Sequence, residues 1–158
     1  MKKALFLILI LLSSTSYADK WKLASFTPDY LNSIWVNVDS IIETGDIKDV
    51  WISTVNIDKK LPYDLALINE KINCRTKSKK TMTYVFYLKG KVSNTLEENG
   101  EWKRVIPGTI TSDYYHVVCN PNIKTPTIDQ KYDLHTFTKV VQDTMRFVKK
   151  EAQSQQKK

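Results

Sequence analysis

The sequence is poor in the residues on which enzyme and metal sites depend. It contains two cysteines and two histidines among 158 residues. The histidines, His116 and His135, share no compact spacing with carboxylates or free thiols, so no metal site is predicted. No G-x-S-x-G nucleophile motif is present in the sequence. We therefore predict no catalytic residue, no metal, no cofactor and no enzyme activity.

The acidic residues give no better indication of catalysis. Glu97 and Glu98 are sequence neighbours beside Asn99-Gly100. That position is typical of solvated loop charges and not of the paired carboxylates that hydrolyse glycosides. Asp113 and His116 stand at i, i+3 spacing, which indicates a helix cap and a surface pair.

Long apolar runs are missing except near the N-terminus. Ala4–Leu12 contains nine apolar residues, whereas a membrane-spanning helix needs about 20. Lys2 and Lys3 precede this run, and Ser16-Tyr17-Ala18 places small residues at −3 and −1 of a cut before residue 19. Residues 1–18 are therefore predicted to be a secretory signal peptide. Because no cysteine lies near the cut, we do not expect a lipoprotein, and the mature protein is expected in the periplasm, at the cell surface or in the medium.

The predicted mature chain is basic and fits one domain. Loss of Lys2 and Lys3 leaves 22 basic and 17 acidic residues, a net charge of +5. The remaining 140 residues suit a single domain. With 4 glycines and 5 prolines, the sequence contains no low-complexity linker.

Both cysteines, Cys74 and Cys119, remain after the predicted cleavage. Their even number in an oxidising compartment predicts a disulfide, and no C-x-x-C spacing indicates redox chemistry. The bridge would close a loop of about 46 residues and stabilise the fold by roughly 4 kcal/mol in the chain-entropy model.

Strands are predicted over most of the chain, and helices near its end. Short runs rich in β-branched and aromatic residues favour an antiparallel meander, because no helix-length segment separates them. Those runs are residues 21–26, 34–38, 50–57, 65–74 and 81–88, with a last strand over 100–105. A short helix capped by Thr111 or Ser112 is predicted to end at Cys119. A second, amphipathic helix is predicted over residues 127–153, with Leu134, Phe137, Val141, Met145 and Val148 at helical spacing and Tyr132, Val140 and Phe147 widening that apolar face.

The order of these segments along the chain is similar to that of a known protein family. The sequence contains VDSI at Val38–Ile41, a strand closing on Cys74, an aromatic strand, a W-x-x-V-x-PG-T segment from Trp102 to Thr109, and a helix ending at Cys119. This order resembles the bacterial surface-adhesin protein E family, over roughly residues 21–120.

The resemblance implies a fold and a role for the cysteines. In that family a single antiparallel sheet curves around a helix, and a disulfide ties the helix to the sheet. Cys74 would be the strand side of the bridge and Cys119 the helix side. The expected fold class is therefore α+β: one curved antiparallel sheet of about six strands, a short helix disulfide-tied to it, and a C-terminal amphipathic helix. The expected division is a signal peptide over 1–18, the protein E-like domain over 19–124, and the C-terminal helix with its basic tail over 125–158.

Two features depart from the family pattern. The adhesin that names the family is a lipid-anchored outer-membrane protein, whereas this chain has no lipid-attachment cysteine. It also has an amphipathic segment after Cys119. That segment could pack on its own domain, pair with a second copy to give a homodimer, or lie on a membrane.

The basic residues provide the candidate partner-binding positions. They belong to two segments expected to be exposed loops, residues 58–64 and 74–80, and they are Lys59, Lys60, Arg75, Lys77, Lys79 and Lys80. A basic loop can serve solubility alone, or it can contact a polyanion. No specific nucleic-acid partner is expected.

The resemblance favours an exported, non-enzymatic binding domain that contacts host extracellular-matrix proteins or polyanions. The alternative is a periplasmic structural or accessory factor for the cell envelope or for secretion, without host contact.

Overall fold

Nine strands form one antiparallel sheet in the part of the chain that the computed structural model describes, which is residues 19–58, 60–120, 122–130 and 133–155. Seven strands lie in the order β7-β6-β5-β4-β2-β1-β9, while β3 pairs with β4 and β8 pairs with β6. Their bounds are β1 (Asp19–Phe26), β2 (Asn32–Asn37), β3 (Ile42–Thr44), β4 (Ile47–Asn56), β5 (Leu65–Asn73), β6 (Ser78–Leu88), β7 (Lys91–Glu97), β8 (Lys103–Arg104) and β9 (Thr127–Gln130). A short 3-10 helix, η2 (Val38–Ser40), follows β2. The predicted signal peptide lies outside the described residues.

The predicted fold class is confirmed, but the count of about six strands is wrong. The strand β7 was missed because all seven of its residues are exposed, so it shows no apolar alternation. The strand predicted over residues 100–105 contains only the two residues of β8. The short β9 lies inside the segment predicted to begin the last helix, and it pairs with β1 at the edge of the sheet.

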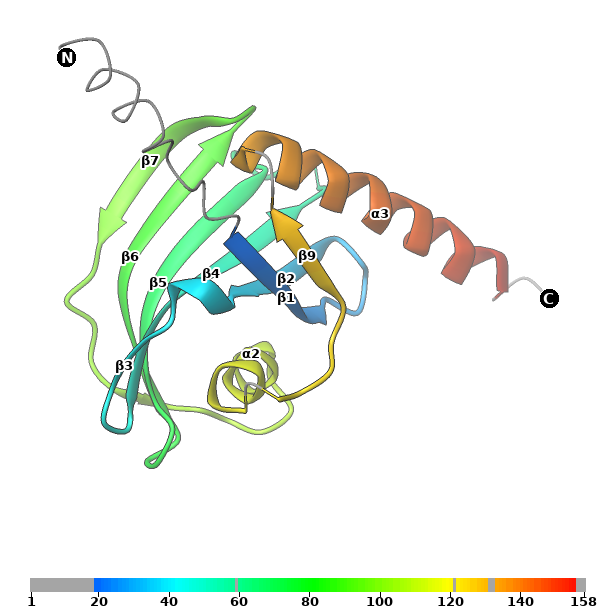
Figure 1. Cartoon of the computed structure of the whole chain (residues 1–158). Coiled ribbons are helices and arrows are strands. Elements are labelled where there is room, and N and C mark those ends of the chain that lie inside the picture. The colour runs from blue at the N-terminus through cyan, green and yellow to red at the C-terminus, as the bar shows by residue number, and fades with distance from the viewer. Residues whose placement is uncertain (1–18, 59, 121, 131–132, 156–158) are drawn as a thin grey trace, which may run out of the picture.

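The sheet curves around one helix and carries the other on its opposite face (Figure 1). Along β2, Ile34 and Val36 contribute to one core cluster and Trp35 to another. Successive side chains of a strand point to opposite faces, so the two clusters lie on the two faces of the sheet. Because both faces of the central strands are covered, their sequences are nearly continuous apolar runs.

The helix α2 (Ile110–Cys119) lies on the concave side of the sheet (Figure 1). Its N-cap is Thr109, whose hydroxyl accepts a hydrogen bond from the backbone N–H of Ser112. The predicted caps, Thr111 and Ser112, are therefore wrong, because the chain already turns into the helix directly after Gly108. Tyr114, Tyr115, Val117 and Val118 are buried in the concave cluster.

The disulfide between Cys74 and Cys119 is confirmed. Cys74 directly follows β5, and Cys119 is the last residue of α2, with 5.6 Å between their Cα atoms. Nearby, the Tyr115 hydroxyl donates to the carbonyl of Cys74 over 2.7 Å. The C-terminal part of α2 is thus joined to the end of β5 by a covalent bond and a hydrogen bond.

The helix α3 (Leu134–Gln155) packs on the face of the sheet opposite α2. Its buried aromatic residue, Phe137, stacks on Trp21 with 5.3 Å between ring centroids and meets Trp35 edge-on at 5.9 Å. The predicted start at residue 127 is wrong, because residues 127–130 join the sheet instead. The carboxylate of Asp133 accepts a hydrogen bond from the backbone N–H of Thr136, which is the geometry of an N-cap.

A two-residue turn brings the β6–β7 hairpin against the start of α3. Lys89 and Gly90 both have positive φ, as a tight two-residue hairpin turn requires. A Cβ atom on Gly90 would stand 2.9 Å from Cβ of His135. Only glycine therefore allows both the turn and this close approach to the helix.

Candidate functional site

The predicted basic positions are divided between opposite ends of β5. Lys60 lies in the loop between β4 and β5, whereas Arg75 and Lys77 lie in the turn after β5. A nine-residue strand is about 30 Å long. Lys59 is outside the described residues. The two loops predicted to touch a partner are therefore separate surfaces.

Two of the predicted loop lysines belong to a strand. The turn after β5 is short, so β6 begins at Ser78 and includes Lys79 and Lys80. Their side chains point to opposite faces of the sheet. Lys79 is opposite Ile72 on the concave face, and Lys80 is opposite Lys71 on the other face. The expectation of one exposed basic loop over 74–80 is thus corrected.

The pairing of β8 with β6 adds two cations that sequence reasoning did not select. Lys103 is opposite Lys79, and Arg104 is opposite Ser78. Both residues of β8 are exposed. They join the turn residues and Lys80 at one end of the sheet, which we call the basic end. Lys103 shares the face of Lys79 there, whereas Arg104 and Lys80 share the other face. The basic end consists of Arg75, Lys77, Lys80, Lys103 and Arg104.

The basic end keeps most of its charge. Arg75 forms an ion pair with Asp46 over 2.9 Å, but both side chains are well exposed, so the pair contributes little. Lys80 donates a hydrogen bond to the neutral amide oxygen of Asn99 over 3.2 Å. Lys77 is exposed and has a φ of 52°, the left-handed conformation of a tight turn. This end of the molecule therefore presents uncompensated positive charge to solvent.

Lys79 belongs instead to a buried polar cluster beneath α2. Its ammonium group pairs with the carboxylate of Glu70, which is 1% exposed and also accepts a hydrogen bond from Thr81 over 3.1 Å. The same ammonium group lies 5.6 Å from the ring centroid of Tyr114. The second carboxylate oxygen of Glu70 has no hydrogen-bond partner among the described residues. Lys79 is therefore a structural cation and not a free contact for a partner.

The surroundings of the cluster raise two pKa values. Burial lowers the pKa of Lys79, but the interactions with Tyr114 and Glu70 outweigh it, so the net shift is upward. Burial raises the pKa of the Tyr114 phenol, and the nearby charge of Glu70 raises it further. Both groups therefore hold their protons more firmly than in an unfolded chain.

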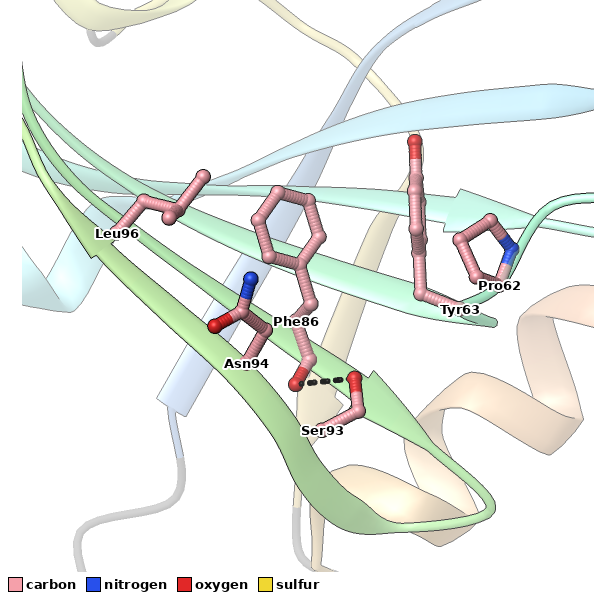
Figure 2. Close-up of a pocket in the computed structure, with 6 residues that line it drawn as sticks. All are labelled: Pro62, Tyr63, Phe86, Ser93, Asn94 and Leu96. Carbon is pink, nitrogen blue, oxygen red and sulfur yellow. Dashed lines mark hydrogen bonds between the residues drawn. The ribbon is translucent and has the colours of Figure 1, made fainter.

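A second candidate surface is a pocket at the other end of the concave face (Figure 2). It is lined by Pro62, Tyr63, Phe86, Ser93, Asn94 and Leu96, and its volume is about 400 Å³. The loop before β5 supplies the first two residues, β6 the third and β7 the rest. The loop 58–64, predicted to contact a partner through its lysines, thus contributes Pro62 and Tyr63 to this pocket. We call this cavity the aromatic pocket.

The described residues give no sign of a metal centre or a membrane-spanning helix. No group of three or more histidine, cysteine, aspartate or glutamate side chains lies close enough to bind a metal ion within the described ranges. Over the same ranges, no helix is long and apolar enough to cross a membrane.

Comparison with known proteins gives one positive result. A family model described as surface-adhesin protein E matches residues 21–120. The match begins in β1, ends just after α2 and includes both cysteines. No curated protein and no solved structure matches the chain.

Proposed function

Because the chain belongs to the surface-adhesin protein E family, we propose that it is an exported, non-enzymatic binding domain. In this proposal it attaches to an anionic partner, such as a polyanionic glycan or a host extracellular-matrix protein. The contact is made through the basic end.

The observation that supports this proposal is the gathering of cations from two segments far apart in the sequence. The β5–β6 turn and β8 are about 25 residues apart, and strand pairing places them side by side. Three of their cations, Lys77, Lys103 and Arg104, have no anionic partner among the described residues. Clustered cations on one surface attract polyanions and accelerate their association.

The backbone beneath the basic end is fixed by a covalent bond and by a hydrogen bond. The disulfide joins Cys74 to α2, and the backbone N–H of Val105 donates to the carbonyl of Lys77 over 2.8 Å. Side chains presented by a fixed backbone lose less conformational entropy on binding than side chains on a mobile loop. The surface therefore suits recognition rather than solubility alone.

The experiment measures binding and location together. The purified mature protein is applied to immobilised heparin and to immobilised extracellular-matrix proteins at low and at physiological salt, and cell fractions are probed for the same protein. The proposal expects salt-sensitive binding to at least one of these surfaces, with the protein at the cell surface or in the medium. A wholly periplasmic protein that binds none of them would contradict the proposal and favour an accessory role in the envelope or in secretion.

A further inference from the structure

We propose that the aromatic pocket is a binding site for a pyranose ring of a neutral glycan. This inference concerns the opposite end of the concave face from the basic end, and it does not depend on the polyanion contact. It rests on the lining of the pocket, the arrangement of its rings and the polar groups around them.

The pocket lies on a part of the concave face that α2 does not cover. Ile52 belongs to the cluster under α2, and the same row of cross-strand pairs continues through Ile68 and Tyr84 to Leu96. Paired residues of an antiparallel sheet point to the same face. The next row outward ends in Phe86 and Asn94, which line the pocket. The sheet therefore continues past α2 as an open, apolar floor.

A bulge in β7 shapes the rim of the pocket. Phe86 pairs with Asn94 and Tyr87 pairs with Val92, which leaves Ser93 as the extra residue. The Ser93 hydroxyl donates to the carbonyl of Phe86 over 3.1 Å and so fixes the bulge (Figure 2). As a result, Asn94 and Leu96 both point to the concave side. The rim is thus built by a local irregularity that the strand holds in place.

The lining selects a neutral ligand. Charged residues make up 26% of the sequence, yet none of the six lining residues is charged. An anionic glycan or an acidic peptide would have to lose its hydration in this pocket without gaining an ion pair, which is unfavourable. Polyanions therefore favour the basic end, and the aromatic pocket favours an uncharged molecule.

The rings offer flat apolar faces. Tyr63 and Phe86 meet at a tilt of 50° with 5.1 Å between centroids, and the Tyr84 ring is nearly parallel to Phe86 at 6.0 Å. Figure 2 shows the Phe86 ring between Leu96 on one side and Tyr63 on the other. All three rings are only partly buried. A ligand with a flat apolar face can therefore stack in the pocket without displacing them.

Polar groups surround these faces. The Asn94 amide oxygen accepts a hydrogen bond from the backbone N–H of Thr95 over 2.9 Å, which leaves its NH₂ group for a ligand. The hydroxyl of Tyr63 forms no hydrogen bond with any described residue. A pyranose ring has the matching chemistry, because its C–H groups form an apolar face and its hydroxyls radiate from the edge. The cavity volume of about 400 Å³ is near the lower end of the range for small-molecule sites, which suits a single sugar ring.

The test measures ligand binding to the mature protein by saturation-transfer NMR and calorimetry. The probes are maltotetraose, cellotetraose and chitotetraose, and a proline-rich decapeptide serves as the competing ligand class. We expect at least one sugar to bind and Phe86→Ala or Tyr63→Ala to weaken it about tenfold, which is the scale of a single aromatic contact. Asn94→Leu keeps the floor and removes the amide, so it is expected to weaken binding as well. Phe147→Ala, on an exposed phenylalanine of α3, is the matched control and leaves binding unchanged.

Two results would overturn the inference: no sugar binds at millimolar concentration, or the decapeptide binds in the pocket and the sugars do not. Circular dichroism of each variant establishes that it is folded. Heparin binding is measured in parallel, since Phe86→Ala leaves the basic end intact. Absence of sugar binding by the unsubstituted protein with heparin binding retained would overturn the pocket inference alone, whereas absence of heparin binding would bear on the proposed function.

Discussion

Glu70 and Lys79 form an ion pair across β5 and β6, beneath the aromatic ring of Tyr114. The carboxylate is 1% exposed. A buried charge is tolerated only when it is paired and hydrogen-bonded, so the stability of the fold around Glu70 depends on Lys79. The Lys79 side chain is thereby withdrawn from the cations of the basic end.

The ion pair predicts the effect of Lys79→Met. This change leaves Glu70 buried without its cation, and we expect the free energy of unfolding to fall by about 2–4 kcal/mol. The control is Lys80→Met on the other face of the same strand, expected to change stability by less than about 0.5 kcal/mol. Urea denaturation measures both. The double variant Glu70→Gln with Lys79→Met is expected to recover part of the stability that Lys79→Met loses. Equal stability of Lys79→Met and Lys80→Met would contradict the role of the pair.

The raised pKa values predict a loss of stability in alkali. The ordinary pKa values of Lys79 and Tyr114 are 10.5 and 10.0, and both are higher in the folded protein. Above about pH 10 an unfolded chain releases these protons while the folded chain retains them, so unfolding becomes more favourable as the pH rises. Urea midpoints between pH 8 and pH 11 measure this trend. The combined Lys79→Met and Tyr114→Phe variant is expected to show a shallower decline, and an unchanged decline would contradict the assignment.

The disulfide predicts a large effect of removing both cysteines. Cys74→Ser with Cys119→Ser is expected to reduce the free energy of unfolding by about 2–4 kcal/mol, because the unfolded chain is no longer cross-linked. Hydrogen exchange should accelerate first in α2, which then depends on the Tyr115 hydrogen bond and on packing. Equal urea midpoints for the oxidised protein and the double variant would show that the bridge does not hold the helix.

Two phenylalanines of α3 test whether this helix packs on its own sheet. Phe137 is 3% exposed between two tryptophans, whereas Phe147 is 65% exposed. Phe137→Ala is expected to destabilise the fold by about 3–5 kcal/mol, and Phe147→Ala by less than about 0.5 kcal/mol. Thermal or urea unfolding measures both. Similar effects of the two substitutions would mean that α3 does not pack as described.

The sequence predicts those parts of the fold that depend on local pattern. The sequence predicts the apolar run of β6, the helical spacing from Phe137 to Met145 and the pairing of Cys74 with Cys119. Each rests on periodicity, or on a count of residues, that is visible along the chain. The strand β7 was missed for the same reason, because its polar residues carry no periodic signal.

The candidate surfaces depend on cross-strand register, which the sequence does not display. Residue type alone placed Lys79 with the surface cations, although register places it beside Glu70. Register also brings Lys103 and Arg104 to the β5–β6 turn. In the aromatic pocket, Tyr63 and Phe86 are 23 residues apart and meet only when the sheet has formed. The basic run over residues 75–80 was a local signal for one half of the basic end, and the Trp102-Lys103-Arg104 stretch was the local signal for the other half.

The most direct measurement compares heparin binding by two charge-reversed variants of equal net charge. One variant changes Lys77, Lys103 and Arg104 to glutamate at the basic end, and the other changes Lys60, Lys91 and Lys150, which are exposed elsewhere. If the basic end is the partner surface, the first variant binds at least about tenfold more weakly than the second, and the difference shrinks as salt is raised. Equal loss of binding in the two variants would show that net charge alone attracts the polyanion, and it would contradict a dedicated binding surface.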